Sequence, residues 1–365
     1  MRPAYRYIVR DILTGQVLTW NLPLVDVSYG PELNGPGALT GRLSPRFVAS
    51  DPQVIDPGNR FIYVERDGLL RWGGILWKAT PQNADYALEA AGWSSYLQRR
   101  HDIHGELDGR GPYVNADPCR VLRDIWAYCQ SLPDGDIGVT VDGTTSTATV
   151  GTPAEPLHSS WWETPVLGDM ADGLVDADDS PDYTCAVAWG PDGAFTHRLQ
   201  VGYPRLGARR ADIRFSTGVN IIDSPPVDRS GDDYANTVIG TGAGEGRSML
   251  RAVDSVRDGR LRLECVLPLP QVKGSDILAR RTAADRKRRQ ILGSVEQITV
   301  RPDHPAAPYG AYQVGDDVLV DVHNVWASYT GWARILGWTV QPGGDSGESV
   351  VIDLARADSY HYGAA

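Results

Sequence analysis

The chain has 365 residues, of which 42% are hydrophobic, and its formal net charge is −11 at pH 7. This length exceeds that at which one core usually stops growing, so we expect two or more domains with little disorder. The negative charge argues against a surface that grips nucleic-acid phosphates. No apolar run reaches the roughly 18–20 residues of a membrane helix, and no signal peptide is visible. We therefore expect the protein to be made and kept, or assembled, in the cytosol.

Residues 1–95 are predicted to form β-structure. Alternating polar and apolar residues at 5–10 and 17–20, separated by a Thr-Gly turn, are typical of a hairpin. Strand-like stretches at 25–29 and 38–43 flank a glycine- and proline-rich loop. Four strands are therefore expected before the chain reaches its first longer motif.

That motif is predicted at residues 58–90 and consists of three strands. A glycine-led strand enters a charged turn, a second strand contains Trp72 and Trp77, and an alternating strand closes the motif at 86–90.

Residues 96–205 are predicted to mix helices and strands. An aspartate followed by Pro118 is the favoured order at a helix start, and apolar residues continue from there at helical spacing. A second helix is expected after Pro165. The Thr-rich stretch 139–150 suits a hairpin, and a Pro-Asp-Gly turn joins two predicted strands within 183–203.

The last part of the chain returns to β-structure around one predicted helix. Strand-like stretches lie within 206–245, an amphipathic helix is expected over 275–292, and the chain is β again from Val295.

Residues 315–355 repeat the motif of residues 58–90. Each copy has a glycine-led strand, then a Trp-containing strand, then an alternating strand. A repeat at this separation indicates two similar β-barrels in one subunit. The predicted fold class is therefore a β-rich α+β protein.

The eleven tryptophans allow a sugar-binding interpretation, since flat rings stack on pyranose faces. Aromatic residues are also enriched at protein interfaces, and four tryptophans occupy equivalent places in the two copies. Trp161 and Trp162 precede a predicted helix in an exposed-looking segment, where a ligand role stays open. The tryptophans predicted to form barrel core or subunit interface are Trp72, Trp77, Trp332 and Trp338.

Three local patterns suggest binding sites but lack the spacing that those sites need. The stretch 240–246 is glycine-rich without GxGxxG spacing or a following Lys-Ser/Thr. The acidic stretch 176–182 lacks the glycine and the carboxylate of a calcium loop, and His101 and His104 form no HExxH. No GxSxG elbow exists either. We therefore predict no catalytic residue, no metal site, no cofactor and no enzyme.

The cysteines also show no site pattern. They are scattered without a CxxC pair and are expected to be free thiols in a reducing compartment: Cys119, Cys129, Cys185 and Cys265.

In their order along the chain, four stretches resemble the tail hub proteins of long-tailed bacteriophages, also called tail-associated or minor tail proteins. This group is similar to the hub of contractile-tail baseplates. None of the stretches carries a catalytic residue, and the resemblance rests on their consistent order over nearly the whole chain. They are 58–77, 164–167 with the strand pair 183–203, 218–221 with 234–238, and 275–292 leading into 315–318.

The resemblance implies a division into four domains. Two similar β-barrel domains would lie at 1–95 and at 206–245 with 295–365. Two mixed α/β insert domains would lie at 96–205 and 246–294, facing the tip and neighbouring subunits. Three subunits would then present six barrels in a ring that matches the six-fold tail tube.

The resemblance also implies a role at the virion tail tip, after synthesis in the host cytoplasm. The ring would nucleate tube assembly around the tape-measure protein and open or close the channel during DNA ejection. Expected partners are two further copies, the distal tail protein or tube ring, the tape-measure protein and other tail-tip minor proteins. Phage DNA would pass through without specific binding, and a hydrolase or fibre would come from another protein.

Two other interpretations stay open. A distal tail adaptor protein forms a six-fold ring and usually has one barrel, so the stoichiometry of the oligomer would decide. A carbohydrate-binding or sugar-cleaving receptor protein would need a groove lined by exposed tryptophans and carboxylates ~5–10 Å apart. Glycan binding that is lost on mutation of Trp161 or Trp162 would support it.

Overall fold

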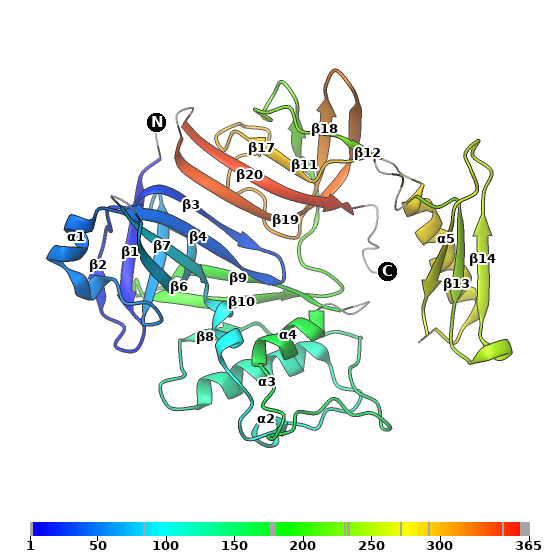
Figure 1. The fold of residues 1–365 in the computed structure, drawn as a ribbon, viewed down its shortest axis with the longest axis horizontal. Coiled ribbons are helices and arrows are strands. Elements are labelled where there is room, and N and C mark those ends of the chain that lie inside the picture. Colours follow the sequence, from blue (N-terminus) through cyan, green and yellow to red (C-terminus); the bar gives the residue numbers. More distant parts are fainter. Residues whose placement is uncertain are drawn as a thin grey trace.

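The protein is β-rich, with few helices among the residues that the structure describes. The largest sheet has 12 strands and draws them from both ends of the chain, while smaller sheets lie in the residues between (Figure 1). None of the described helices combines the length and apolar character that a membrane crossing requires. This computed structural model describes residues 3–357 except 83–84, 176–179, 230, 232–233, 271, 291–292 and 345–346.

The amino-terminal part of the 12-stranded sheet, which we call the first module, is antiparallel throughout. Its strand order is β3-β4-β7-β6-β5-β1-β2. Helix α1 (Pro45–Ser50) and a 3₁₀ helix (Pro52–Val54) connect β4 to β5. The strands are β1 (Tyr5–Asp11), β2 (Val17–Thr19), β3 (Val25–Glu32), β4 (Gly35–Leu43), β5 (Arg60–Arg66), β6 (Leu69–Gln82) and β7 (Asp85–Gly92).

The carboxy-terminal part, which we call the second module, is organised around one long strand, β19. This strand pairs with β18 through its first half and with β20 through its second half. Beyond β18, β19 pairs with β3 of the first module at Gly337↔Glu32 and Val340↔Tyr29, so the two modules share one sheet. The strands are β11 (Arg209–Ser216), β17 (Gln297–Val300), β18 (Asp317–His323), β19 (Ser328–Gly344) and β20 (Gly347–Arg356).

The two modules contain four strands in the same order. These are β4-β7-β6-β5 in the first and β17-β20-β19-β18 in the second, and every neighbouring pair is antiparallel. The predicted motifs at 58–90 and 315–355 therefore adopt the same three-strand arrangement. The flanking strands differ, because β1 runs antiparallel to β5 whereas β11 runs parallel to β18.

The prediction of two β-barrels is not confirmed, because the described strands form no closed barrel. In the first module, β3 pairs with β19 of the second module instead of closing on its own module. In the second, the described residues connect β11 to β17 through the isolated bridges Thr217↔Ile221 and Ile221↔Val300. A closed barrel would pair the outer edge of β3 with a strand of its own module. Here that edge pairs with β19 and joins the two modules.

Residues 93–205 form a layer of helices and a small sheet beside the first module (Figure 1). Asp117 caps α3 as predicted, since its carboxylate accepts a hydrogen bond from Cys119 N. The predicted strand pair within 183–203 is also confirmed as β9 and β10. The elements are a 3₁₀ helix (Trp93–Arg99), α2 (Glu106–Gly109), α3 (Pro118–Ser131), β8 (Val139–Val141), α4 (Leu167–Val175), β9 (Asp182–Trp189) and β10 (Phe195–Gly202).

The predicted hairpin at 139–150 is wrong. Only its first three residues form a strand, β8, and this strand runs parallel to β10. After β8, the Asp142 carboxylate accepts hydrogen bonds from the N–H groups of Thr144 and Val201, and Arg123 donates to the Thr144 carbonyl. Side chains thus satisfy backbone groups that a returning strand would have used.

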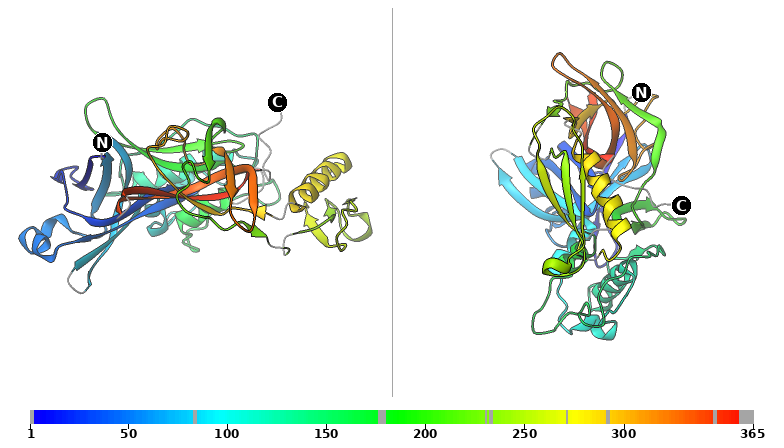
Figure 2. Two further views of the ribbon diagram at one scale, coloured as in Figure 1. Left: turned by 90° about the horizontal axis from the view of Figure 1, so that it is seen from above. Right: turned by 90° about the vertical axis from the view of Figure 1, so that its right-hand side faces the viewer.

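A small sheet with one helix lies to one side of the large sheet (Figures 1 and 2). Its strand order is β14-β13-β15, and α5 packs across β13 and β14. Residues 237–241, grouped above with the second barrel, form β13 of this sheet. The predicted helix is confirmed as α5, but its predicted apolar stripe is not, because its buried face carries Leu278, Thr282 and Asp285; residues 291–292 lie outside the described part. The elements are β12 (Asp228–Arg229), β13 (Thr237–Thr241), a 3₁₀ helix (Gly246–Ser248), β14 (Arg251–Ser255), β15 (Glu264–Pro268), α5 (Ser275–Arg289) and β16 (Gly293–Ser294), which pairs with β12.

Two large cores meet at strand β5. Ile62 and Val64 face the core that the two modules share, whereas Phe61 and Tyr63 face the core formed with residues 93–205. Successive strand side chains point to opposite faces, so an uninterrupted apolar run is what a strand buried on both faces needs. The sheet therefore fixes the modules and the helical layer relative to each other.

Candidate functional site

Two of the four predicted tryptophans pack into the core that the modules share. Trp72 on β6 is buried there. Trp338 on β19 is half-buried against the same core, and its ring meets Tyr312 edge-on with the ring centres 5.6 Å apart. One tryptophan from each module thus contributes to the same core.

The other two tryptophans lie elsewhere. Trp77 is half-buried against the core of residues 93–205, where its Nε1 donates to Ser95 Oγ at 2.8 Å. Trp332 is half-buried, with the Arg209 guanidinium 4.8 Å from its ring centre.

The backbones of the two modules approach closely at the β3–β19 pairing. A Cβ atom at Gly30 would lie 1.6 Å from the Trp338 carbonyl oxygen, so glycine is required at this position. Beside it, Tyr29 is fully buried and packs edge-on against Tyr5. The joint is therefore built from a close backbone contact covered by aromatic rings.

An ion pair also links the modules. Arg66 at the end of β5 donates to the Glu348 carboxylate of β20 through Nε at 2.8 Å and Nη2 at 2.7 Å. The two side chains are only 13% and 6% exposed. The Tyr5 hydroxyl also donates to Glu348, and burial together with this bond raises the pKa of Tyr5. The Arg66 guanidinium lies 5.2 Å from the ring centre of Tyr309.

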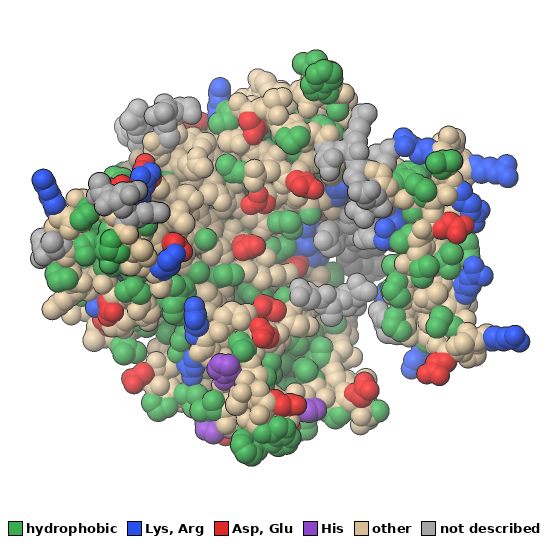
Figure 3. All heavy atoms as spheres, in the orientation of Figure 1, with side chains coloured by type: hydrophobic (Ala, Val, Ile, Leu, Met, Phe, Trp, Pro, Cys, Tyr) green, Lys and Arg blue, Asp and Glu red, His purple; other side chains and the backbone are tan. Residues whose placement is uncertain are grey.

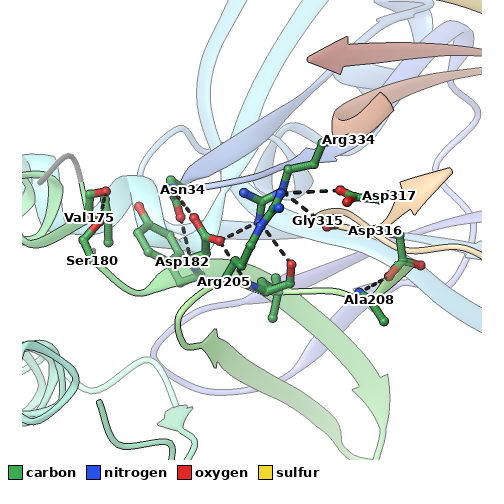
Figure 4. Close-up of polar contacts among 12 residues, drawn as sticks. Asn34, Val175, Ser180, Asp182, Arg205, Ala208, Gly315, Asp316, Asp317 and Arg334 are labelled. Atoms are coloured by element: carbon green, nitrogen blue, oxygen red, sulfur yellow. Dashed lines mark hydrogen bonds and ion pairs between the residues drawn. The ribbon is translucent and has the colours of Figure 1, made fainter. Parts of the chain in front are cut away.

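A buried charge cluster joins β9 to the second module (Figure 4). Arg334 of β19 bonds to Asp182 of β9 at 2.5 Å and to the Leu206 carbonyl at 3.1 Å. Asp182 also accepts hydrogen bonds from Asn34 Nδ2 at 3.1 Å and from the Leu206 N–H at 2.9 Å. Three distant parts of the chain therefore meet at one carboxylate.

Further ion pairs extend this cluster along β18. Arg205 lies 3.4 Å from the buried Asp317, and the neighbouring Asp316 accepts a hydrogen bond from the Ala208 N–H at 2.9 Å. Arg210 lies 3.6 Å from Asp316. Both aspartates therefore have a guanidinium nearby. Buried charges of this kind fix one arrangement of the chain, because breaking a pair leaves an uncompensated charge. We interpret the cluster as structural.

The hairpin tip between β18 and β19 presents apolar side chains to solvent. Val325 and Trp326 are 92% and 90% exposed. Asn324 fixes the turn, because its Oδ1 accepts hydrogen bonds from the N–H groups of Trp326 and Ala327. Its Nδ2 donates to the Pro225 carbonyl at 3.2 Å, which ties the turn to a neighbouring loop. The adjacent exposed valine and tryptophan make this tip a candidate contact surface.

A second exposed aromatic pair lies in the loop before α4. Trp161 and Trp162 are largely exposed, and their ring planes stand at 86° to each other. Perpendicular rings offer no single flat platform for a sugar. Side chains of apolar residues are visible at this end of the molecule, below the large sheet, in Figure 3.

The remaining sequence patterns have structural explanations where they are described. His101 Nδ1 bonds to the Thr164 carbonyl and His104 Nδ1 to the Tyr128 hydroxyl. The glycine-rich stretch 240–246 leaves β13 and ends in a 3₁₀ turn. Most of the acidic stretch, residues 176–179, lies outside the described part. Within the described residues, no group of three His, Cys, Asp or Glu side chains is arranged to hold a metal ion.

Three solved structures, all of prophage or bacterial tail proteins, match the chain over nearly its full length. They are the MuSo2 prophage 43 kDa tail protein from Shewanella oneidensis (15% identity, TM-score 0.60, 98% of each chain), a tail protein from Neisseria meningitidis (13%, 0.53, 96% of this chain and 97% of that one) and prophage tail protein gp18 from Listeria monocytogenes (11%, 0.54, 96% and 95%). Neither the protein-family models nor the curated proteins contain a match. The chain therefore has the fold of these tail proteins, as the sequence resemblance predicted.

Sequence reasoning missed the residues that join the modules and the exposed hairpin tip. An adjacent Val325-Trp326 pair in a turn, where polar residues are usual, was the available signal for the tip. The partners Arg66 and Glu348 lie 282 positions apart, and nothing local identifies them as a pair.

Proposed function

We propose that this protein is the structural hub of a phage tail tip. Three copies form a ring that presents six β-modules to the six-fold tail tube. The ring nucleates tube assembly around the tape-measure protein and opens or closes the channel when DNA is ejected. DNA passes through without specific binding, and the chain catalyses no reaction.

The internal repeat is the observation that carries this proposal. Four strands recur in the same order in both modules, and β19 joins the modules in one sheet. Two equivalent modules in one chain allow a three-fold ring to approximate six-fold symmetry. The shared fold with prophage tail proteins supports a place in the tail.

The proposal assigns different tasks to the parts of the chain. The modules line the ring, with Trp72 and Trp338 in their shared core and Trp332 near a subunit contact. The helical layer of residues 93–205 and the sheet that carries α5 face the tip and neighbouring proteins. These neighbours are the distal tail protein or tube ring and other tail-tip minor proteins.

Light scattering on the purified full chain tests the stoichiometry. A mass near three times 39.7 kDa is expected. A mass near six times that value would instead favour the hexameric distal tail adaptor. A monomer across the whole concentration series would contradict the ring.

A further inference from the structure

Charge is distributed unevenly along the chain. Residues 245–290, which include β14, β15 and α5, contain 12 Lys and Arg and six Asp and Glu, a balance of +6. Residues 101–182, which form most of the helical layer, contain three Lys and Arg and 16 Asp and Glu, a balance of −13. Figure 3 shows basic side chains along the outer edge of the part that carries α5. One chain therefore carries two regions of opposite charge.

The outward side of α5 is basic. Leu278 and Thr282 are buried on the side toward the sheet. Arg280, Arg281 and Lys287 lie on the other side of the helix, and all three are exposed. We call these three residues the basic side of α5.

Other cations of α5 have partners inside the same small domain. Arg286 pairs with Asp254 at 2.6 Å, and Arg289 pairs with Asp285 at 2.7 Å. The three cations of the basic side form no ion pair among the residues that the structure describes. Their charge is therefore available to a partner.

An acidic surface lies on the outer side of α4 in the helical layer. Glu163 and Asp169 are exposed, and Asp172 is half-buried with Gln98 Nε2 donating to it at 3.0 Å. The buried residues of α4 face the core of the helical layer, away from these carboxylates. We call Glu163, Asp169 and Asp172 the acidic side of α4. Gathered carboxylates of this kind attract a cationic partner.

The two surfaces do not meet within one copy. No described helix or strand of the sheet that carries α5 packs against a helix or strand of the helical layer. This sheet stands apart from the layer (Figure 1), and the short strands β12 and β16 lie where the chain enters and leaves it. Both charged surfaces are thus open to another molecule.

We infer that the basic side of α5 docks on the acidic side of α4 in a neighbouring copy of this chain. The inference rests on the ring proposed above and names one of its contacts. The occupant follows from charge complementarity, because this chain itself carries the acidic surface that α5 requires. Copies with a net charge of −11 repel each other, and opposite charges that face each other offset this repulsion. A contact between two different surfaces is the kind from which rings close.

Charge reversal on either side tests the contact. Arg280→Glu with Lys287→Glu in the full-length chain should weaken self-association roughly 10-fold or more, because like charges would then face each other. Glu163→Lys with Asp169→Lys should weaken it similarly, although this variant lowers the net charge and with it the general repulsion. Sedimentation over a concentration series measures both, and circular dichroism establishes that each variant is folded.

Combining the two reversals distinguishes a second copy from any other acidic partner. A chain with all four substitutions again places opposite charges at the contact, so its association should return close to that of the wild type. Failure to recover, in a folded protein, would overturn the inference. Arg46→Glu with Arg301→Glu is the matched control, since it changes two exposed cations outside the small domain and should have little effect.

Cross-linking identifies what α5 touches. A photoreactive amino acid at position 280, in a mixture of isotope-labelled and unlabelled chains, should attach between copies to residues within 101–182. Attachment within one copy only, or between copies to other residues, would overturn the inference. Attachment only to added duplex DNA or to an added tube protein would assign the basic side to that partner and overturn it too.

The outcomes separate this inference from the proposal beneath it. A wild-type trimer that both charge reversals leave intact overturns the contact and leaves the ring standing. A monomeric wild-type chain overturns both.

Discussion

At the residue scale, a small number of partly or fully buried polar side chains determine how the parts of the chain are joined. Arg66 and Glu348 hold the two modules together, and Arg334 with Asp182 holds β9 against the second module. Such pairs are sensitive to the loss of one partner, because the remaining charge stays buried.

Replacing Glu348 by glutamine should therefore destabilise the protein. The substitution keeps the shape but removes the buried countercharge of Arg66 and leaves it the half-exposed Asp67 at 3.3 Å, at a cost of about 1–3 kcal/mol in the free energy of unfolding. Glu89→Gln is the control, since Glu89 and its partner Lys78 are 54% and 59% exposed and such pairs contribute ~0–1 kcal/mol. Urea denaturation measures both. Equal effects of the two substitutions would show that the Arg66 pair does not stabilise the joint.

His197 should make stability depend on pH. It is buried, with Nε2 2.8 Å from the Tyr63 hydroxyl, and burial lowers its pKa to about 4 from 6.5. Between these values the unfolded chain binds a proton that the folded chain does not. Stability should therefore rise from pH 4 to pH 6.5, by about 3 kcal/mol from this residue. His197→Gln should remove that part of the slope. An unchanged slope in denaturation curves would contradict the assignment.

At the element scale, the β3–β19 pairing is the contact that turns two modules into one sheet. The pairing depends on close backbone approach at Gly30, where a methyl group would meet the Trp338 carbonyl. Strand glycines often mark such approaches.

Gly30→Ala should separate the strands at this point and lower stability by about 1–3 kcal/mol or more, as overpacking does. Gly41→Ala is the matched control on β4, because its added carbon would lie at an ordinary 3.5 Å from Val27. Thermal unfolding compares the two variants. A Gly30→Ala protein as stable as Gly41→Ala would show that the pairing tolerates a wider spacing.

The elements that could be predicted are those whose signals lie within a few residues. The motifs at 58–90 and 315–355 follow from alternation and turn residues, and α3 follows from its cap and Pro118. Barrel closure could not be predicted this way, because β3 and its partner β19 lie about 300 positions apart. The prediction of a hairpin at 139–150 was wrong because the side chains of Asp142 and Arg123 form the hydrogen bonds to backbone groups that a second strand would have formed.

Among the site residues, the sequence singled out four tryptophans but not the contacts around them. The four were predicted to occupy equivalent places in the two copies, yet Trp77 and Trp338 pack against different cores. A repeat predicts strand order, whereas the surroundings of each copy depend on which other part of the chain packs against it.

At the scale of the whole molecule, the proposed ring depends on two similar modules that are linked within one chain. In the first module, β3 pairs with β19 and Arg66 pairs with Glu348, whereas the second module exposes Val325 and Trp326 at its β18–β19 turn. In the proposed ring, contacts between different surfaces of neighbouring copies would close after three subunits.

An electron-microscopy image of the particle's tail tip tests this account most directly. Averaged views down the tail axis should show three copies of this chain at the end of the tube, with six similar modules around the channel. A single copy, or six copies with one module each facing the tube, would contradict the account.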